Sequence, residues 1–90
     1  MLGTRSVIER LAQFLLNIGE LYGDADGERI VVRRTITHGQ IASMVGATRQ
    51  WVTMKLDGFR KSGIISVTRQ AIVIEKPDLL QTIVGREFDG

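Results

Sequence analysis

Apolar residues between positions 36 and 65 recur at helical spacing in two segments, and a short break separates the segments. Thr37 and Gln40 stand three residues apart at the start of the first segment, which is the spacing of a capping box. Ile36 and Ile41 stand where a hydrophobic staple would join the preceding chain to the first turn of a helix. The pattern therefore predicts a helix that begins after Thr37.

Gly46 follows the first segment at a position that favours a permissive backbone, and Thr48 is placed to cap a second helix that runs towards Lys61. The apolar positions of this helix recur at i, i+4 and i+7 and form one stripe: Val52, Leu56 and Phe59. A different face carries Arg49, Gln50, Thr53 and Met54. Two helices joined by a tight turn, the second with an outward face, indicate a helix-turn-helix over residues 37–61 with a recognition helix over residues 48–61.

The chain before this motif predicts one helix and one strand. Residues 5–22 form an amphipathic helix that Thr4 or Ser6 could cap and that Gly23 ends. Its apolar stripe is Ile8, Leu11, Leu15 and Ile18. Residues 24–27 predict a turn. Residues 28–36 are rich in β-branched side chains and predict a strand, or a short strand and a bend, that leads into the motif.

The chain after the motif predicts a β-wing. Ser62 and Gly63 predict the end of the recognition helix. Two short β segments follow within residues 64–74, and three polar residues join them over a hairpin-length connection. Arg69 lies in that connection, so we expect it at or near the tip of the wing.

Pro77 suits the first turn of a short final helix over residues 78–84, and residues 85–90 predict a frayed tail. No repeat, low-complexity segment or linker divides the 90 residues. The order helix, strand, helix, turn, helix, wing, helix predicts an α+β fold. We expect a winged helix-turn-helix, mainly α with a small antiparallel β-wing, in a single domain over residues 1–90.

The distribution of charge along the chain is more informative about a binding partner than the net charge, which is only +2. Basic and acidic residues balance at five each over residues 1–45. Residues 48–70 carry Asp57 as their single acidic residue against five basic residues: Arg49, Lys55, Arg60, Lys61 and Arg69. A one-sided basic excess is what binding to a phosphate backbone requires, although a solvated helix face gives the same pattern.

The residue content excludes or disfavours several classes of function. The chain has no cysteine and a single histidine, His38, so a cysteine-based metal site is impossible and any metal site is disfavoured. No G-x-S-x-G context and no G-x-x-x-x-G-K-[ST] phosphate loop occur, so we do not expect an enzyme, and we expect no cofactor in this chain. No apolar run approaches the roughly 20 residues of a membrane span, and the N-terminus is unlike a signal peptide. We therefore expect a cytoplasmic protein without a membrane partner.

The candidate base-reading residues lie on the outward face of the recognition helix: Arg49, Gln50 and Met54. Arginine pairs with guanine O6 and N7, glutamine pairs with adenine, and an apolar side chain can contact the thymine methyl group. The alternatives are that Arg49 contacts solvent or Asp57 and that Met54 packs under the wing. Trp51 is expected to pack against the first helix of the motif, with contact to the DNA backbone as the alternative.

The candidate phosphate contacts surround that face: Thr37, His38, Thr48, Thr53, Lys55 and Arg69. Hydroxyl groups, basic side chains and the amides of helix N-termini are the usual partners of DNA phosphates. For His38 the alternative is a polar surface residue without a ligand. Arg33 and Arg34, just before the motif, are weaker candidates for the same contacts.

The motif and the wing resemble the C-terminal DNA-binding domain of the CRP/FNR superfamily of bacterial transcription regulators. The resemblance covers about residues 9–84. Its most specific part is the spacing T-x-x-x-I-A-x-x-V-G-x-[ST]-R-[EQ]-x-V, met by Thr37, Ile41, Ala42, Val45, Gly46, Thr48, Arg49, Gln50 and Val52. The resemblance implies a recognition helix that reads a palindromic operator through an arginine, the next residue and a further arginine. Arg49 and Gln50 match the first two positions, whereas Met54 replaces the second arginine, so no operator sequence is predicted.

The same resemblance implies a β-roll effector domain and a long dimerisation helix before this domain, and only a few residues precede the first predicted helix. We therefore expect the chain to be a piece of a longer regulator rather than a free-standing domain. The implied partners are double-stranded DNA, a second copy in a homodimer of the full-length regulator and RNA polymerase.

A second hypothesis from the residues is a winged helix that binds a partner protein, with Trp51 and Met54 as an apolar anchor. The surface of the recognition helix distinguishes the two hypotheses. A basic face favours DNA, and a neutral apolar patch favours a protein.

Overall fold

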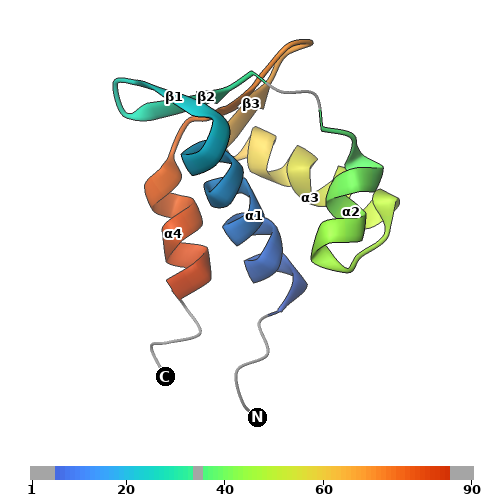
Figure 1. The fold of residues 1–90 in the computed structure, drawn as a ribbon. Helices are drawn as coiled ribbons and strands as arrows, with labels where there is room; N and C mark the ends of the chain where they lie inside the picture. Colours follow the sequence, from blue (N-terminus) through green and yellow to red (C-terminus); the bar gives the residue numbers. More distant parts are fainter. Residues whose placement is uncertain (1–5, 34–35, 86–90) are drawn as a thin grey trace.

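The computed structural model describes residues 6–33 and 36–85, and within these ranges the helices lie on one side of a small sheet (Figure 1). The elements in chain order are α1 (Val7–Tyr22), β1 (Gly23–Asp26), β2 (Arg29–Val32), α2 (His38–Val45), α3 (Arg49–Lys61), β3 (Ile65–Val67), β4 (Ile72–Ile74) and α4 (Pro77–Gly85). Helix α1 lies between α4 on one side and the α2–α3 pair on the other (Figure 1). This order confirms the predicted winged helix-turn-helix of the α+β class.

Helix α1 begins and ends through local contacts that the sequence predicts. Ser6 caps it and forms a capping box with Glu9, in which Ser6 Oγ accepts from the Glu9 N–H at 3.3 Å. The other candidate cap, Thr4, lies outside the described residues. Gly23 follows the last turn because a Cβ there would lie 2.3 Å from Ile30 Cγ2 and 2.4 Å from the carbonyl oxygen of Gly19. A glycine therefore lets the chain leave the helix close against β2.

The sheet is larger than the predicted wing, because it has four antiparallel strands in the order β1-β2-β4-β3 within the described residues. The prediction of a turn over residues 24–27 is wrong. Residues Gly23–Asp26 form β1, and the turn follows at Gly27, whose φ of +65° suits glycine. The two acidic side chains of β1 pair with basic residues of the returning chain, which favours the extended conformation: Asp24 Oδ2 with Arg33 Nη1 at 3.0 Å, and Asp26 Oδ2 with Arg29 Nη2 at 2.6 Å.

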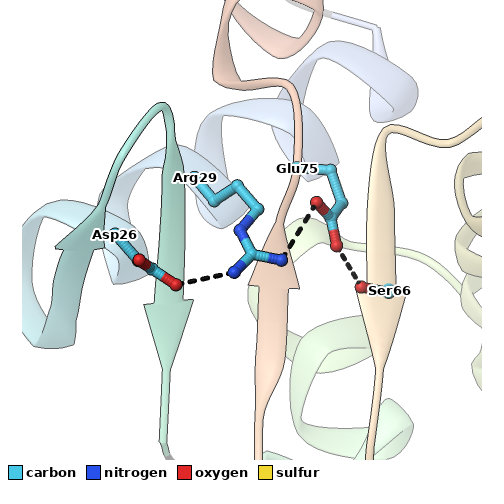
Figure 2. A network of polar contacts seen from close by, with 4 residues as sticks. All are labelled: Asp26, Arg29, Ser66 and Glu75. Atoms are coloured by element: carbon cyan, nitrogen blue, oxygen red, sulfur yellow. Dashed lines mark hydrogen bonds and ion pairs between the residues drawn. The ribbon is translucent and has the colours of Figure 1, made fainter.

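A polar network crosses one face of the sheet (Figure 2). The guanidinium of Arg29 lies between Asp26 and Glu75, with 3.8 Å from Arg29 Nη1 to Glu75 Oε1. Ser66 Oγ donates to Glu75 Oε2 at 2.5 Å. The hydrogen bond with Asp26, followed by its charge, raises the pKa of Arg29. The network joins the β1–β2 hairpin to the base of the wing, so side-chain contacts connect the wing to the rest of the sheet.

The predicted strand over residues 28–36 is shorter in the structure, since β2 ends at Val32, and residues 34–35 lie outside the described part of the chain. The predicted wing is confirmed, because β3 and β4 pair with Ile65 opposite Ile74. Helix α4 begins at Pro77 and reaches Gly85, one residue into the predicted tail, and nothing is described beyond it.

The core of the described residues is formed by side chains from all four helices and from the sheet. Its largest fully buried side chains are Leu11, Leu15, Val32, Ile41, Val52, Ile65, Ile74 and Leu80. The predicted stripe of the recognition helix is buried as expected, since Val52, Leu56 and Phe59 are all inside. Burying a large aliphatic or aromatic side chain contributes about 1.5–3 kcal/mol, so this stripe fixes which face of α3 points inward. The opposite face of α3 is exposed.

Candidate nucleic-acid interface

Side-chain caps hold the two helices of the motif at both of their N-termini. Thr37 Oγ1 accepts from the Gln40 N–H at 3.0 Å, and Gln40 Oε1 accepts from the Thr37 N–H at 2.8 Å, which confirms the predicted capping box. Gly46 has the left-handed φ of +79° that its position was predicted to need. Thr48 Oγ1 then accepts from the Trp51 N–H at 3.0 Å and starts α3. Both threonine hydroxyls act here as acceptors, and among the described residues neither donates its hydrogen, which is available to an external acceptor.

The outward face of α3 presents the side chains that the sequence predicts there. Arg49, Gln50, Thr53 and Met54 are all exposed, and Met54 is 58% exposed rather than packed under the wing. Within the described residues the Arg49 guanidinium has no hydrogen-bond or ion-pair partner. The alternative of an Arg49–Asp57 pair is therefore absent from this part of the structure, and the guanidinium is available to a ligand.

Asp57 pairs instead with two cations on its own helix. Arg60 Nη2 donates to Asp57 Oδ1, and Lys61 Nζ lies 3.1 Å from Asp57 Oδ2. The hydrogen bond from Arg60, followed by that from Lys61, lowers the pKa of Asp57. Of the five basic residues between positions 48 and 70, three keep no carboxylate partner in the described part of the chain: Arg49, Lys55 and Arg69.

Trp51 is half-buried and packs against the core, as the preferred sequence interpretation expects. Lys55 lies one turn further along the same side of α3, with its Nζ 5.8 Å from the centroid of the Trp51 ring. This distance is within the range of a cation–π contact. Lys55 therefore lies on the Trp51 side of α3, at the border of the outward face rather than on it.

His38 is half-buried, and its Nδ1 lies 2.7 Å from Thr53 Oγ1. The contact joins the first residue of α2 to the middle of α3. Sequence reasoning missed this pair, because the two residues are fifteen positions apart and only the crossing of the helices brings them together. His38 therefore has an intramolecular partner on α3.

The wing places Arg69 beside the motif. Thr68 Oγ1 accepts from the Ala71 N–H at 3.0 Å, and the Thr68 N–H donates to the Ala71 carbonyl at 2.9 Å, which closes the tip of the hairpin. Arg69 is exposed in this tip, as predicted. Of the weaker candidates before the motif, Arg33 is paired with Asp24 and Arg34 lies outside the described residues.

An open hollow of about 220 Å³ lies between α2, α3 and the wing. We call it the motif hollow. It is lined by His38, Thr53, Leu56, Asp57, Arg60 and Val67. A second hollow adjoins it under the wing and is lined by His38 and Arg69 among others. The predicted phosphate contacts His38, Thr53 and Arg69 are thus brought to one region of the surface.

Residues 6–33 and 36–85 contain neither a candidate metal site nor a candidate membrane-spanning helix. No group of three or more histidine, cysteine, aspartate or glutamate residues there could hold a metal ion. None of the helices described is both long and apolar enough to cross a membrane.

The capped helix pair, the wing and the exposed face of α3 that carries Arg49 define a winged helix-turn-helix of the nucleic-acid-binding kind. Residues 9–83 match the Crp-like helix-turn-helix domain family. The chain is 31% identical over 86 residues to the fumarate nitrate reduction regulatory protein of Klebsiella oxytoca, and 31% identical over 85 residues to electron transport regulator A of Shewanella oneidensis. These alignments cover 96% and 94% of this chain and 34% of each relative, so the chain spans about a third of their length.

Solved structures agree with the sequence matches. The CO-dependent transcription factor CooA from Carboxydothermus hydrogenoformans superposes with a TM-score of 0.78 at 28% identity, over 88% of this chain and 37% of that one. A CRP-family transcriptional regulator from Thermus thermophilus gives a TM-score of 0.77 over 91% of this chain and 42% of its own; at 23% identity it supports the fold alone. The chain belongs to the Crp-like helix-turn-helix domain family and is a DNA-binding domain of the CRP/FNR type of transcription regulator. The relatives that support this assignment are regulatory proteins rather than enzymes.

Proposed function

We propose that this domain binds double-stranded DNA sequence-specifically, with α3 in the major groove. The observation that carries the proposal is that the Arg49 side chain is exposed and available to a ligand. Its guanidinium is exposed in the first turn of a capped helix and is unpaired within the described residues. A recognition helix reads base edges with residues near its N-terminus, and arginine is the commonest reader of guanine.

The base-reading set of this proposal is Arg49, Gln50 and Met54. Gln50 lies beside Arg49 and offers a bidentate amide, and Met54 lies one turn further along with an apolar side chain that fits a thymine methyl group. The phosphate-contacting set is Thr37, His38, Thr48, Thr53, Lys55 and Arg69. Within the described residues the hydroxyl hydrogens of the two capping threonines and the Arg69 guanidinium have no partner, which supports these assignments.

The proposal extends to the assembly in which the domain acts. We propose that a longer regulator containing it binds a palindromic operator in bacterial cytoplasm as a homodimer and contacts RNA polymerase. In that arrangement each copy would read one half-site, because the two-fold symmetry of a dimer matches that of a palindrome. We propose no cofactor for this chain, in keeping with its residue content.

The structure gives less support to a protein-binding winged helix. That hypothesis needs Trp51 and Met54 together as an apolar anchor, but Trp51 is half-buried against the core and only Met54 is freely exposed. The neighbours of Met54 on the outward face are Arg49, Gln50 and Thr53, all polar. A mainly polar face that carries an exposed arginine suits DNA better than a protein partner.

Titration of the chain with a promoter-sized duplex at several ionic strengths tests DNA binding directly. We expect weak binding at low salt, with an affinity that falls steeply as salt rises, since each neutralised phosphate contributes about 0.9 to the slope of log K against log salt concentration. Binding that does not depend on salt, or no binding at low salt, contradicts the proposal.

A further inference from the structure

His38 stands at the junction of the three elements that form the proposed DNA surface. It is the first residue of α2, its Nδ1 lies 2.7 Å from Thr53 Oγ1 on α3, and it lines both the motif hollow and the hollow under the wing. Its second ring nitrogen, Nε2, has no partner in the part of the chain that the structure describes. The imidazole is therefore held at one nitrogen and available at the other.

The charged groups around His38 do not neutralise it. From α3, Asp57 and Arg60 line the motif hollow, but the two oxygens of Asp57 are engaged by Arg60 and Lys61. From the wing, Arg69 lines the adjoining hollow. Helix α2 contributes no other charged residue. A positive charge on the imidazole would thus meet no uncommitted carboxylate among the described residues.

The number of hydrogen-bond donors that His38 and Thr53 present to a ligand depends on whether the His38 imidazole is protonated. In a neutral imidazole one nitrogen donates and the other accepts. If Nδ1 accepts from the Thr53 hydroxyl, only Nε2–H remains for a ligand. If Nδ1–H donates to Thr53 Oγ1, the hydroxyl hydrogen remains, but Nε2 becomes an acceptor that disfavours a phosphate. In the protonated form Nδ1–H donates to Thr53, and both Nε2–H and the Thr53 hydroxyl are free to donate.

We propose that His38 and Thr53 form a proton-controlled phosphate clamp, so that protonation of His38 is coupled to DNA binding. This inference rests on the proposed function. One proton converts the pair from one outward donor to two and adds a positive charge at the same place. Both changes favour a phosphate, because hydrogen bonds from an ionised donor are roughly twice as strong as neutral ones.

The direction of the pH dependence follows from whether the free or the DNA-bound protein holds the proton of His38 more tightly. A phosphate stabilises the imidazolium, so the complex holds the proton to a higher pH than the free protein does. The gain in affinity is therefore complete at low pH and is lost as pH rises through the titration of the complex. Imidazole groups change charge between pH 5 and 8, and each unit by which DNA raises the titration midpoint changes the affinity about tenfold.

The test is the affinity for one duplex between pH 5.5 and pH 7.5 at constant ionic strength. His38 is the single histidine of the chain, which makes the assignment of a pH dependence direct. We expect the wild-type affinity to be severalfold higher at pH 5.5 than at pH 7.5, and His38→Gln to show a flat profile. Gln81→His in the His38→Gln background is the matched control, because it returns one imidazole to an exposed position on α4. We expect that profile to be flat as well.

The outcomes separate the clamp from the proposed function. A wild-type profile that is flat while DNA still binds, or an equal slope in His38→Gln, overturns the clamp and leaves DNA binding intact. Absence of binding at every pH overturns both. Proton NMR of the His38 ring in the free and DNA-bound wild type gives a second measurement that needs no variant. A titration midpoint that rises on binding supports the clamp, and an unchanged midpoint overturns it.

Discussion

The hydroxyl of Thr48 accepts a hydrogen bond from the backbone N–H of Trp51 at 3.0 Å. Arg49 lies between these residues in the first turn of α3, so this cap orients the backbone that carries the principal base-reading candidate. The cap is local, involves one side chain and has a conservative replacement, and these properties allow it to be tested separately from the chemistry of Arg49.

Thr48→Ala should destabilise the fold by about 1 kcal/mol, because one N–H of the first turn loses its acceptor. Thr48→Ser keeps the hydroxyl and should stay close to the wild type. Chemical denaturation of the three proteins measures the difference. Equal denaturation midpoints for Thr48→Ala and the wild type would show that the cap contributes nothing to stability.

Gly46 and Gly58 should respond in opposite directions to the same substitution. Gly46→Ala places a Cβ at φ +79° and should cost about 1–2 kcal/mol, because that conformation is left-handed. Gly58→Ala lies inside α3, where a Cβ would meet nothing within 4 Å, and should stabilise the helix by up to about 1 kcal/mol. Thermal or urea unfolding of both variants checks the signs. The same sign for both variants would contradict the assigned turn geometry.

Asp57→Asn should strengthen DNA binding at low salt. The substitution removes the charge that holds Arg60 and Lys61, and Arg60 already lines the motif hollow. Each cation that becomes available to a phosphate steepens the dependence of log K on log salt concentration by about 0.9. Asp78→Asn, which removes an exposed charge from the first turn of α4, is the control. If both variants change the salt slope equally, the effect is one of net charge and the local account is wrong.

Asp57 also makes a prediction about pH. The hydrogen bond from Arg60, and then that from Lys61, lowers the pKa of its carboxyl group. A group with a lowered pKa in the folded state contributes stability above its unfolded pKa and loses it as pH falls through the folded value. The wild type should therefore be more stable than Asp57→Asn at pH 7, and the difference should shrink as the solution is acidified below about pH 4. Urea unfolding across this range tests the trend, and a difference that stays constant contradicts it.

The parts of the fold that rest on near neighbours were predictable from the sequence. Thr37 with Gln40, the Thr48 cap and the turn at Gly46 involve residues at most a few positions apart, so the sequence alone contains their partners. The apolar stripe of α3 follows equally from its spacing.

The parts that rest on distant partners were not predictable in the same way. Strand β1 has little β propensity of its own, and its conformation depends on pairing with β2 and on the ion pairs of Asp24 and Asp26. The pairing of β2 with β4 joins segments about forty residues apart. The His38–Thr53 contact depends on how α2 crosses α3, which residue periodicity does not specify.

The most direct test of the account is the sequence preference of the Arg49→Ala variant. Duplexes selected from a randomised pool by the wild type supply a preferred site, and affinities for that site and for a scrambled one give the preference. Gln81→Ala, on the exposed face of α4, is the control. We predict that Arg49→Ala reduces the preference by about 1–3 kcal/mol and leaves most of the affinity for the scrambled duplex. A preference equal to that of the wild type would contradict the assignment of Arg49 as a base-reading residue.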